Sequence, residues 1–294
     1  ESFQQDSNRW REFTPVPGTQ CLGNDLRENQ NCQRHQRRRQ ALDPAAGAVE
    51  LSDQELPQTS TRSPVDRSGE PILRVTNLTS RGNTGEIDVD DVSLEIFKGA
   101  IFGLVGQSGS GKTTLLNAIG GLDIPDSGEV WVAGSRVDQM SKGELADLRL
   151  ASIGFVFQAY NLIPVLTARE NVEFVMQVQG VSAAERREKS LAILKEVGLH
   201  GLEDRRPAEM SGGQQQRVAV ARAVVSQPKL VLADEPTANL DTANGEQAME
   251  IMQRLNKETG TAFVFATHDP RVVAYARRVI TLRDGRVVSN GAGE

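Results

Sequence analysis

The eight residues Gly106 to Thr113 match the pattern G-x-x-x-x-G-K-T, which is typical of a loop that binds nucleotide phosphates. Its glycines let successive backbone amides turn toward phosphate oxygens at the positive end of a helix. Lys112 adds a point charge at the outer phosphates, and Thr113 offers a hydroxyl to Mg²⁺. A flexible Gly-Ser loop is the plain alternative, but the strand-like run before this segment and the helix-like run after it argue against that reading. The predicted binding residues are Gly106, Gln107, Ser108, Gly109, Ser110, Gly111, Lys112, Thr113 and Thr114.

Four polar side chains at the ends of apolar runs complete the candidate chemistry. Asp234 can hold Mg²⁺ through its water shell, and Glu235 can orient or deprotonate an attacking water. Gln158 can reach the metal or the water through its amide, and His268 can donate a hydrogen bond to a terminal phosphate. Acidic pairs and single histidines are also common as plain loop or core residues, but behind a phosphate loop we prefer the chemical reading. The predicted catalytic residues are therefore Glu235, His268 and Gln158, and the predicted metal-binding residues are Thr113, Gln158 and Asp234.

A second glycine-rich segment, Met210 to Gln214, follows the first by about a hundred residues. It opens the predicted helix 215–225 and so builds a second anion-binding helix terminus. The first loop already surrounds one face of a nucleotide. The second segment is therefore expected to contact the outer phosphate of a nucleotide that is bound by another copy of the chain. The sequence thus predicts two protomers paired head to tail, in which each copy offers Ser211, Gly212, Gly213 and Gln214 to its neighbour's nucleotide.

Three short runs must position these groups: 101–105, 230–233 and 263–266. Each run is apolar on both faces, which is typical of central parallel strands that helices cover on both sides. Each ends at one of the polar elements above. Because ligands of open parallel sheets gather at the carboxyl ends of the strands, the three elements should converge on one ligand.

The remaining patterns outline the domain. Strands are predicted at 72–75, 92–96 and 130–132 as an antiparallel layer, and Asp284-Gly285 predicts a hairpin between 280–282 and 287–288. Helical spacing at 183–194 lies in a predicted helical subdomain of about 167–212. The predicted division is a disordered extension at 1–69, one domain at 70–290 that contains all of these motifs, and a tail at 291–294.

Composition excludes several function classes. The chain has 294 residues, with 38% hydrophobic and 24% charged residues, and a net charge of -6. A negative net charge does not favour binding to nucleic acid. A basic run of the size of 34–39 is more often simply solvated, so no nucleic-acid partner is expected. No apolar run approaches the roughly 18 to 20 residues that cross a bilayer. The two cysteines, Cys21 and Cys32, lie far from the predicted chemistry and suit a reducing compartment.

Residues 70 to about 290 resemble the nucleotide-binding subunit of an ABC transporter. The motifs that carry the resemblance are Walker A (106–113), the Q-loop (Gln158), the signature (210–214), Walker B (230–234), the D-loop (239–241) and the H-loop (His268). Segments 120–123, 232–237 and 267–270 are most similar to the lipoprotein-release and macrolide-export group. The resemblance implies an α/β P-loop NTPase (RecA-like) fold with a parallel-sheet core, an antiparallel β layer and an α-helical subdomain. It also implies ATP and Mg²⁺ as ligands, ATP hydrolysis in a dimer, which we expect to be a homodimer, and a separate membrane permease contacted from the cytoplasmic side.

Two departures from the family accompany the resemblance. Family members usually place an aromatic residue near the end of the first strand to stack on adenine, whereas 78–82 contains none. Either Arg81 stacks instead or adenine recognition is weak. The signature begins with Met210 where leucine is usual, which is a volume-conserving change.

The motifs also fit two other classes of protein. One is a soluble ABC ATPase that acts on the ribosome or nucleic acid, although such proteins resemble paired units or carry long coiled-coil insertions. Another is a P-loop protein without turnover, which Glu235 and His268 argue against. The segment after Gln158 is unusually apolar and predicts either a permease-docking groove or core packing; its apolar members are Tyr160, Leu162, Ile163, Pro164 and Val165.

Overall fold

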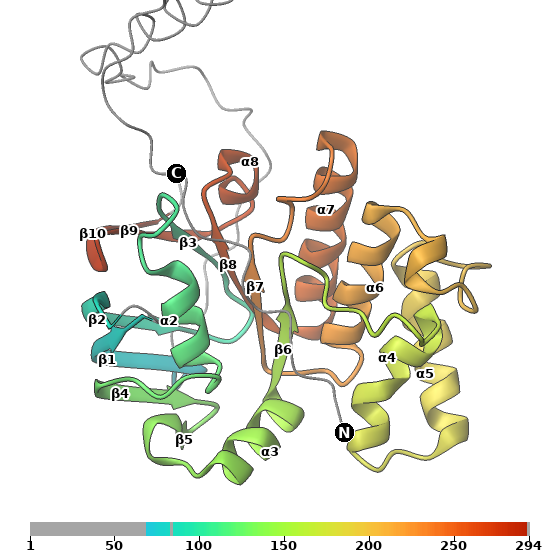
Figure 1. Ribbon diagram of the computed structural model, residues 1–294, viewed down its shortest axis with the longest axis horizontal. Coiled ribbons are helices and arrows are strands. Elements are labelled where there is room, and N and C mark those ends of the chain that lie inside the picture. Colours follow the sequence, from blue (N-terminus) through green and yellow to red (C-terminus); the bar gives the residue numbers. More distant parts are fainter. Residues whose placement is uncertain (1–68, 83–84, 293–294) are drawn as a thin grey trace, which may run out of the picture. The chain divides into compact units, whose positions relative to one another are not determined.

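The computed structural model describes residues 69–82 and 85–292, and a six-stranded mixed sheet forms the centre of this part (Figure 1). Its strand order is β10-β9-β3-β8-β7-β6. Strands β9, β3, β8, β7 and β6 pair in parallel, and β10 pairs antiparallel with β9. The predicted parallel core is therefore confirmed. The bounds are β3 (Ile101–Val105), β6 (Ile153–Val156), β7 (Leu230–Asp234), β8 (Ala262–Thr267), β9 (Arg278–Arg283) and β10 (Arg286–Ala292).

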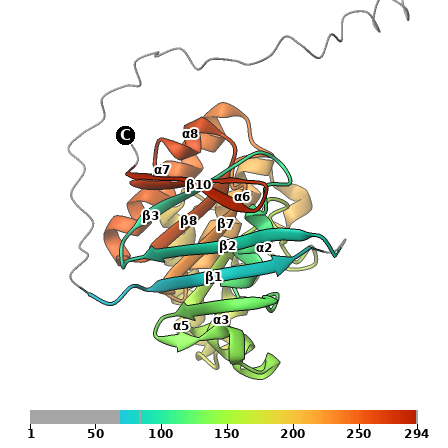
Figure 2. The same ribbon diagram turned by 90° about the vertical axis from the view of Figure 1, so that its left-hand side faces the viewer.

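The antiparallel layer is a separate four-stranded sheet of order β2-β1-β4-β5, which lies beside β10 (Figure 2). Strand β1 continues beyond its predicted end at residue 75, and strand β2 begins before its predicted start at residue 92. Asn77 and Asp91 have positive φ angles of 47° and 53°, and the Asn77 amide donates to the Asp91 carboxylate at 2.7 Å. The ladder shifts register at this point and then continues. The bounds are β1 (Leu73–Arg81), β2 (Ile87–Ile96), β4 (Ser127–Val132) and β5 (Ser135–Arg136).

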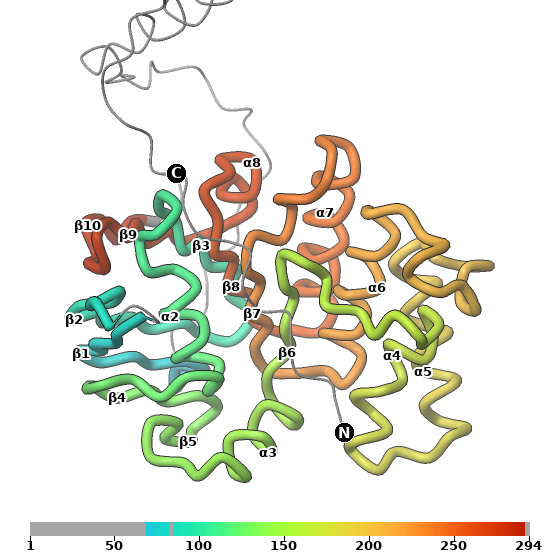
Figure 3. Tube along the Cα trace, in the orientation of Figure 1, coloured from blue at the N-terminus to red at the C-terminus, as the bar shows by residue number. Residues whose placement is uncertain are grey.

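Helices cover the central sheet and extend beyond it (Figure 3). Helices α4 and α5 fall within the predicted helical subdomain, and α6 begins at its end. The α-helices are α2 (Lys112–Ile119), α3 (Lys142–Ser152), α4 (Ala168–Val178), α5 (Ala183–Glu196), α6 (Gly212–Val224), α7 (Thr242–Thr259) and α8 (Pro270–Val273), with 3-10 turns η1 (Val137–Gln139) and η2 (Pro207–Glu209).

Two hydrophobic cores lie on opposite faces of the central sheet. Along β7, Leu230 and Leu232 pack with α2 and the antiparallel layer, whereas Val231 and Ala233 pack with α4, α6 and α7. Strand β8 divides its residues in the same way. Because successive side chains of a strand point to opposite faces, strands between two cores must be apolar at every position. This double burial explains the continuous apolar runs in the sequence.

The helix starts differ in how their free amides are satisfied. Helices α3, α4 and α6 begin at capping boxes in which an N-cap side chain and the residue three positions on bond each other's backbone. Helix α2 begins at Gly111, which has a φ of 96° and provides no side-chain cap. Its first amides are therefore left for another partner.

The predicted extension at 1–69 lies outside the described residues except for Gly69. At the other end β10 continues to Ala292, so two residues of the predicted tail belong to the sheet. Within the described residues no helix is both long and apolar enough to cross a membrane.

Candidate nucleotide site

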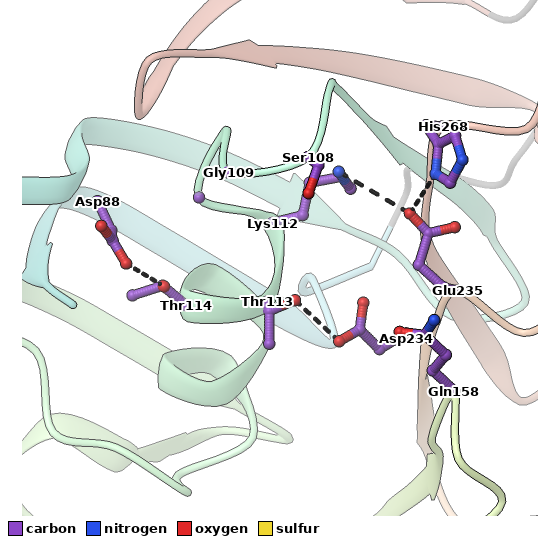
Figure 4. Close-up of a pocket in the computed structure, with 11 residues that line it drawn as sticks. Asp88, Ser108, Gly109, Lys112, Thr113, Thr114, Gln158, Asp234, Glu235 and His268 are labelled. Carbon is purple, nitrogen blue, oxygen red and sulfur yellow. Dashed lines mark hydrogen bonds and ion pairs between the residues drawn. The ribbon is translucent and has the colours of Figure 1, made fainter. Parts of the chain in front are cut away.

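A cavity of about 370 Å³ opens at the carboxyl ends of β6, β7 and β8, against the start of α2 (Figure 4). The three polar elements predicted to converge do meet here. The side chains and backbone that line it come from β2, the phosphate loop and these strand ends: Asp88, Ser108, Gly109, Gly111, Lys112, Thr113, Thr114, Gln158, Asp234, Glu235 and His268.

Lys112 is the buried cation of the cavity, with 6% of its side chain exposed. Its Nζ donates to the carbonyl oxygens of Gly106 at 2.7 Å and Gln107 at 2.9 Å. The loop therefore curls around its own lysine, and these two predicted residues support the ammonium group without lining the cavity. Nζ also lies 3.9 Å from Oε1 of Glu235. The positive charge is thus directed toward the strand ends.

Glu235 has a left-handed backbone with a φ of 44°, which is unusual for a residue other than glycine. Its amide donates to the carbonyl of Ala266 at 2.8 Å, and its Oε2 accepts from the Thr267 hydroxyl at 3.2 Å. Its Oε1 lies 2.7 Å from Nδ1 of His268. Strained conformations of this kind persist where surrounding contacts fix them. The Glu235 carboxylate is thereby held between Lys112 and His268.

Asp234 lies deeper in the cavity, beside the start of α2. Its Oδ2 accepts from the Thr113 hydroxyl at 2.9 Å, and its Oδ1 is buried without a hydrogen-bond partner among the described residues. Burial raises the pKa of the Asp234 carboxyl, and the negative charge of Glu235 raises the pKa further. The hydrogen bond from Thr113 and the positive charge of Lys112 act in the opposite direction and lower the pKa.

An unpartnered carboxylate oxygen next to a hydroxyl fits a hard divalent cation such as Mg²⁺. No cluster of three or more histidine, cysteine or acidic side chains suited to a metal occurs in the described part of the chain. A cation here would complete its coordination with phosphate oxygens and water, as Mg²⁺ commonly does. Gln158 lines the same wall, and its backbone carbonyl accepts from the Asn239 amide at 2.7 Å.

The second glycine-rich segment does not line this cavity. Ser211 is exposed and caps α6, where its hydroxyl accepts from the Gln214 amide at 3.3 Å and its own amide donates to Oε1 of Gln214 at 3.0 Å. Gly213 lies so close to Asn244 that a Cβ atom on it would be 2.2 Å from the Asn244 Oδ1. Within the segment Ser211 is exposed, whereas Met210 and Gly213 are buried, and none of residues 210–214 lines the cavity of its own chain.

Asp88 on β2 lines the cavity but is not among the residues predicted from the sequence. Its Oδ2 accepts from the hydroxyl of Thr114 at 2.8 Å. A single acidic residue in a strand carries no motif, so only the folded arrangement reveals it. Arg81, the suggested substitute for the aromatic, is not among the residues that line the cavity; its Nη1 donates to the carbonyl of Gly85 at 2.9 Å.

Residues 89–238 match the family model described as ABC transporter. The chain belongs to the ABC transporter family. It is an ATPase cassette of that family, and the predicted fold class is confirmed.

Among curated proteins, this ABC cassette is similar to the Macrolide export ATP-binding/permease protein MacB of Burkholderia pseudomallei (strain 1710b), with 45% identity over 223 residues. The match covers 75% of this chain and 34% of the relative. MacB of Neisseria gonorrhoeae is 46% identical over 222 residues, which cover 74% of this chain and 34% of that protein. The cassette therefore spans about a third of the length of the curated relatives it matches.

Among solved structures, the ATP-binding cassette MJ0796 in a dimeric post-hydrolysis state bound to ADP and Pi has a TM-score of 0.71 and 40% identity. That match covers 76% of this chain and 99% of the other. The cassette cbiO1 of Clostridium perfringens, part of the ABC transporter complex cbiONQ, has a TM-score of 0.70 and 30% identity, with coverage of 76% and 90%.

A second, more apolar cavity of about 400 Å³ lies between the cassette's β6 and α4. The predicted docking segment contributes little to it. Of residues 160–165 only Asn161 lines this cavity, while Leu162 packs on a hydrophobic core and Val165 is 71% exposed. The larger apolar side chains that do line it come from neighbouring elements: Leu122, Leu150, Ile153, Phe155, Phe157, Phe174, Val175 and Val178.

Proposed function

We propose that this cassette binds ATP and Mg²⁺ in the cavity around Lys112, pairs head to tail with a second copy, and hydrolyses ATP with Glu235 as the general base. One observation carries the proposal. The Glu235 carboxylate is fixed 2.7 Å from His268 and 3.9 Å from the Lys112 ammonium group, in a cavity that also contains the uncapped start of α2. A base, a cation and free helix amides in one cavity suit transfer of a phosphoryl group to water.

The phosphate loop supplies the contacts to the triphosphate. The first amides of α2 and the Lys112 ammonium group bind phosphate oxygens, so the lysine exchanges its loop carbonyls for the nucleotide. Thr113 and Asp234 hold Mg²⁺, with Gln158 beside them. When bound, the ion neutralises charge that develops on the phosphate oxygens. His268 orients the Glu235 carboxylate and donates toward the terminal phosphate.

The second copy supplies the rest of the site. Ser211 is exposed, lies outside its own chain's cavity, and begins a helix whose positive end attracts anions. Similarity to a cassette whose structure is described as dimeric supports this pairing. Ser211 to Gln214 of one copy then close over the outer phosphate bound by the other.

The nucleotide-driven pairing would act on a membrane permease of an export or lipoprotein-release system, which the cassette contacts at the cytoplasmic side of the membrane. The MacB relatives, named for both ATP binding and permease activity, support the export assignment. The apolar cavity between β6 and α4 is the candidate docking groove, because it begins directly before Gln158 and exposes Phe174 and Val178.

The closed dimer is tested with Glu235→Gln. This change keeps the shape of the side chain but removes its basicity, so phosphate release should fall by about 100-fold or more, while ATP binding persists and dimers accumulate. Sedimentation with ATP and Mg²⁺ measures the dimer. Glu235→Gln combined with Lys112→Ala is the matched control and should stay monomeric. A monomeric Glu235→Gln protein that still binds ATP would contradict the head-to-tail site.

The permease is tested by affinity purification from detergent-solubilised membranes. We expect an integral membrane protein to co-purify and to be lost when Phe174→Asp places a charge in the apolar cavity. Val288→Asp, at an exposed residue of β10 outside the cavity, is the control and should keep the partner. Co-purification of ribosomal RNA without a membrane protein would favour the soluble reading.

A further inference from the structure

We infer that Asp88 gives this site a preference for ribonucleotides over deoxyribonucleotides, because its carboxylate accepts a hydrogen bond from a ribose hydroxyl of the bound nucleotide. The inference rests on the proposed function. It concerns the end of the cavity for which the sequence suggested Arg81, a residue that does not line the cavity.

The cavity has two chemically different ends (Figure 4). Glu235 and His268 lie at one end, Asp88 and Thr114 lie at the other, and Lys112 is between them. In the proposed function Glu235 faces the outer phosphate. A nucleotide bound along the cavity then directs its innermost phosphate, and the sugar attached to it, toward Asp88.

The backbone of Asp88 is fixed by close contacts on two sides. A Cβ atom on Gly111 would lie 2.1 Å from the Asp88 carbonyl oxygen, and one on Gly285 would lie 2.7 Å from it. Both glycines have positive φ angles, of 96° and 75°. Only glycine allows backbones to approach so closely in this conformation. The Asp88 side chain therefore projects from a backbone that is clamped between the phosphate loop and the β9–β10 hairpin.

The Asp88 carboxylate also occupies the space beside Gly82, at the end of β1. A Cβ atom on Gly82 would lie 2.2 Å from Oδ2 of Asp88. A larger side chain on Gly82, such as an aromatic ring, would have to displace that carboxylate. None of the described residues that line the cavity is phenylalanine, tyrosine or tryptophan. Recognition at this end therefore depends on a polar group.

The chemistry of the carboxylate selects its partner. Oδ2 accepts from Thr114, and no described residue donates a hydrogen bond to Oδ1, so one acceptor oxygen is free. An ionised carboxylate only accepts hydrogen bonds, and the ribose hydroxyls are the donors nearest to the innermost phosphate. The amino group of adenine lies on the far edge of the base. Acidic side chains bind ribose hydroxyls in the same way in dinucleotide sites.

The test measures binding of ADP, 2′-deoxy-ADP and 3′-deoxy-ADP by calorimetry, because these diphosphates are not hydrolysed during the titration. The wild-type protein should bind ADP at least about 10-fold more tightly than one of the deoxy analogues, which is the effect of one hydrogen bond to a charged group. Asp88→Ala should reduce this ratio to less than about threefold. The control Asp90→Asn removes a carboxylate of the same strand that lies outside the cavity and pairs with Arg286, and it should keep the wild-type ratio.

Two results would overturn the inference. One is equal binding of ADP and both deoxy analogues by the wild-type protein, a measurement that stands even if Asp88→Ala fails to fold. The other is a ribose preference that survives Asp88→Ala. A parallel titration with purine riboside 5′-diphosphate, which lacks the 6-amino group, tests the base. If loss of that amino group weakens binding in an Asp88-dependent way and loss of the hydroxyls does not, Asp88 contacts the base, and the inference is overturned. In these cases ADP still binds, whereas absence of any ADP binding to the folded wild type would instead contradict the proposed function.

Discussion

Two glycine-rich helix starts in this molecule are similar in sequence and opposite in environment. Helix α2 has Gly111 as its N-cap, at the wall of a cavity, has no side-chain cap and starts with the buried Lys112. Helix α6 has the exposed Ser211 as its N-cap, is capped by the side chains of Ser211 and Gln214, and has no cation in 210–214. The first is equipped to bind phosphate by itself. The second has its amides partly satisfied and needs a ligand delivered to it.

This difference assigns separate tasks to the two helix starts. Nucleotide affinity should depend on α2, because its free amides and its lysine face the cavity within one chain. Turnover should depend on both starts, since in the proposed dimer the outer phosphate is enclosed only when α6 of a second copy contacts it. The following substitutions separate affinity from turnover.

Lys112→Ala should have the largest effect. It removes the only lysine or arginine among the described residues of the cavity, so ADP should bind at least about 10-fold more weakly. ATP turnover should fall by about 100-fold or more, as when other donors to developing charge are removed. Calorimetry and a phosphate-release assay measure the two effects. Unchanged ADP affinity would mean that the loop around Lys112 is not the nucleotide site.

Ser211→Ala should lower turnover by about 10-fold or more but leave ADP affinity within about twofold, because in the proposed dimer the serine contacts the nucleotide of the second copy. Loss of the cap should also cost about 0.5 to 2 kcal/mol of helix stability. Ser141→Ala is the matched control, since Ser141 caps α3 with the same capping-box geometry and does not line the cavity. Thermal melts should show a similar loss for both variants. A turnover defect of equal size in Ser141→Ala would reduce the role of Ser211 to stability.

Thr113→Val should have the smallest effect, confined to the metal. Replacing the hydroxyl with a methyl group removes a ligand of the proposed cation site, so the Mg²⁺ concentration for half-maximal turnover should rise several-fold. Affinity for ADP without Mg²⁺ should change little. Thr113→Ser keeps the hydroxyl and should behave like the wild type. If both variants shift the Mg²⁺ requirement equally, packing of the side chain rather than its oxygen is responsible.

Continuous apolar runs and their polar ends made the central sheet predictable. Strands between two cores have no polar face, and their order along the sheet brought Asp234, Glu235 and His268 together as expected. The Asp284-Gly285 turn was equally readable, because both residues adopt positive φ angles that this pair tolerates. In each case local chemistry and tertiary environment favour the same structure.

In β1, β2, α6 and around Asp88, local sequence and tertiary environment favour different structures. Strands β1 and β2 extend beyond their predicted ends because Asn77 and Asp91, which resemble turn residues, form an irregularity within the ladder. Helix α6 begins at Gly212 rather than at 215, since the Ser211 cap compensates for glycines of low helix propensity. Asp88 was invisible because its partners, Gly82, Thr114 and Gly285, come from three separate segments. Such a contact has no spacing that a sequence pattern could contain.

The tip of the β9–β10 hairpin has one further consequence. The amide of Gly285 donates to the carbonyl of Ser110 at 3.2 Å, and its own carbonyl accepts from the Asp90 amide at 2.9 Å. The backbone of Gly285 thus connects the phosphate loop to β2 of the antiparallel layer through two hydrogen bonds. Because both bonds use the backbone of one residue, any displacement of Ser110 in the phosphate loop would shift β2 and the β9–β10 hairpin with it.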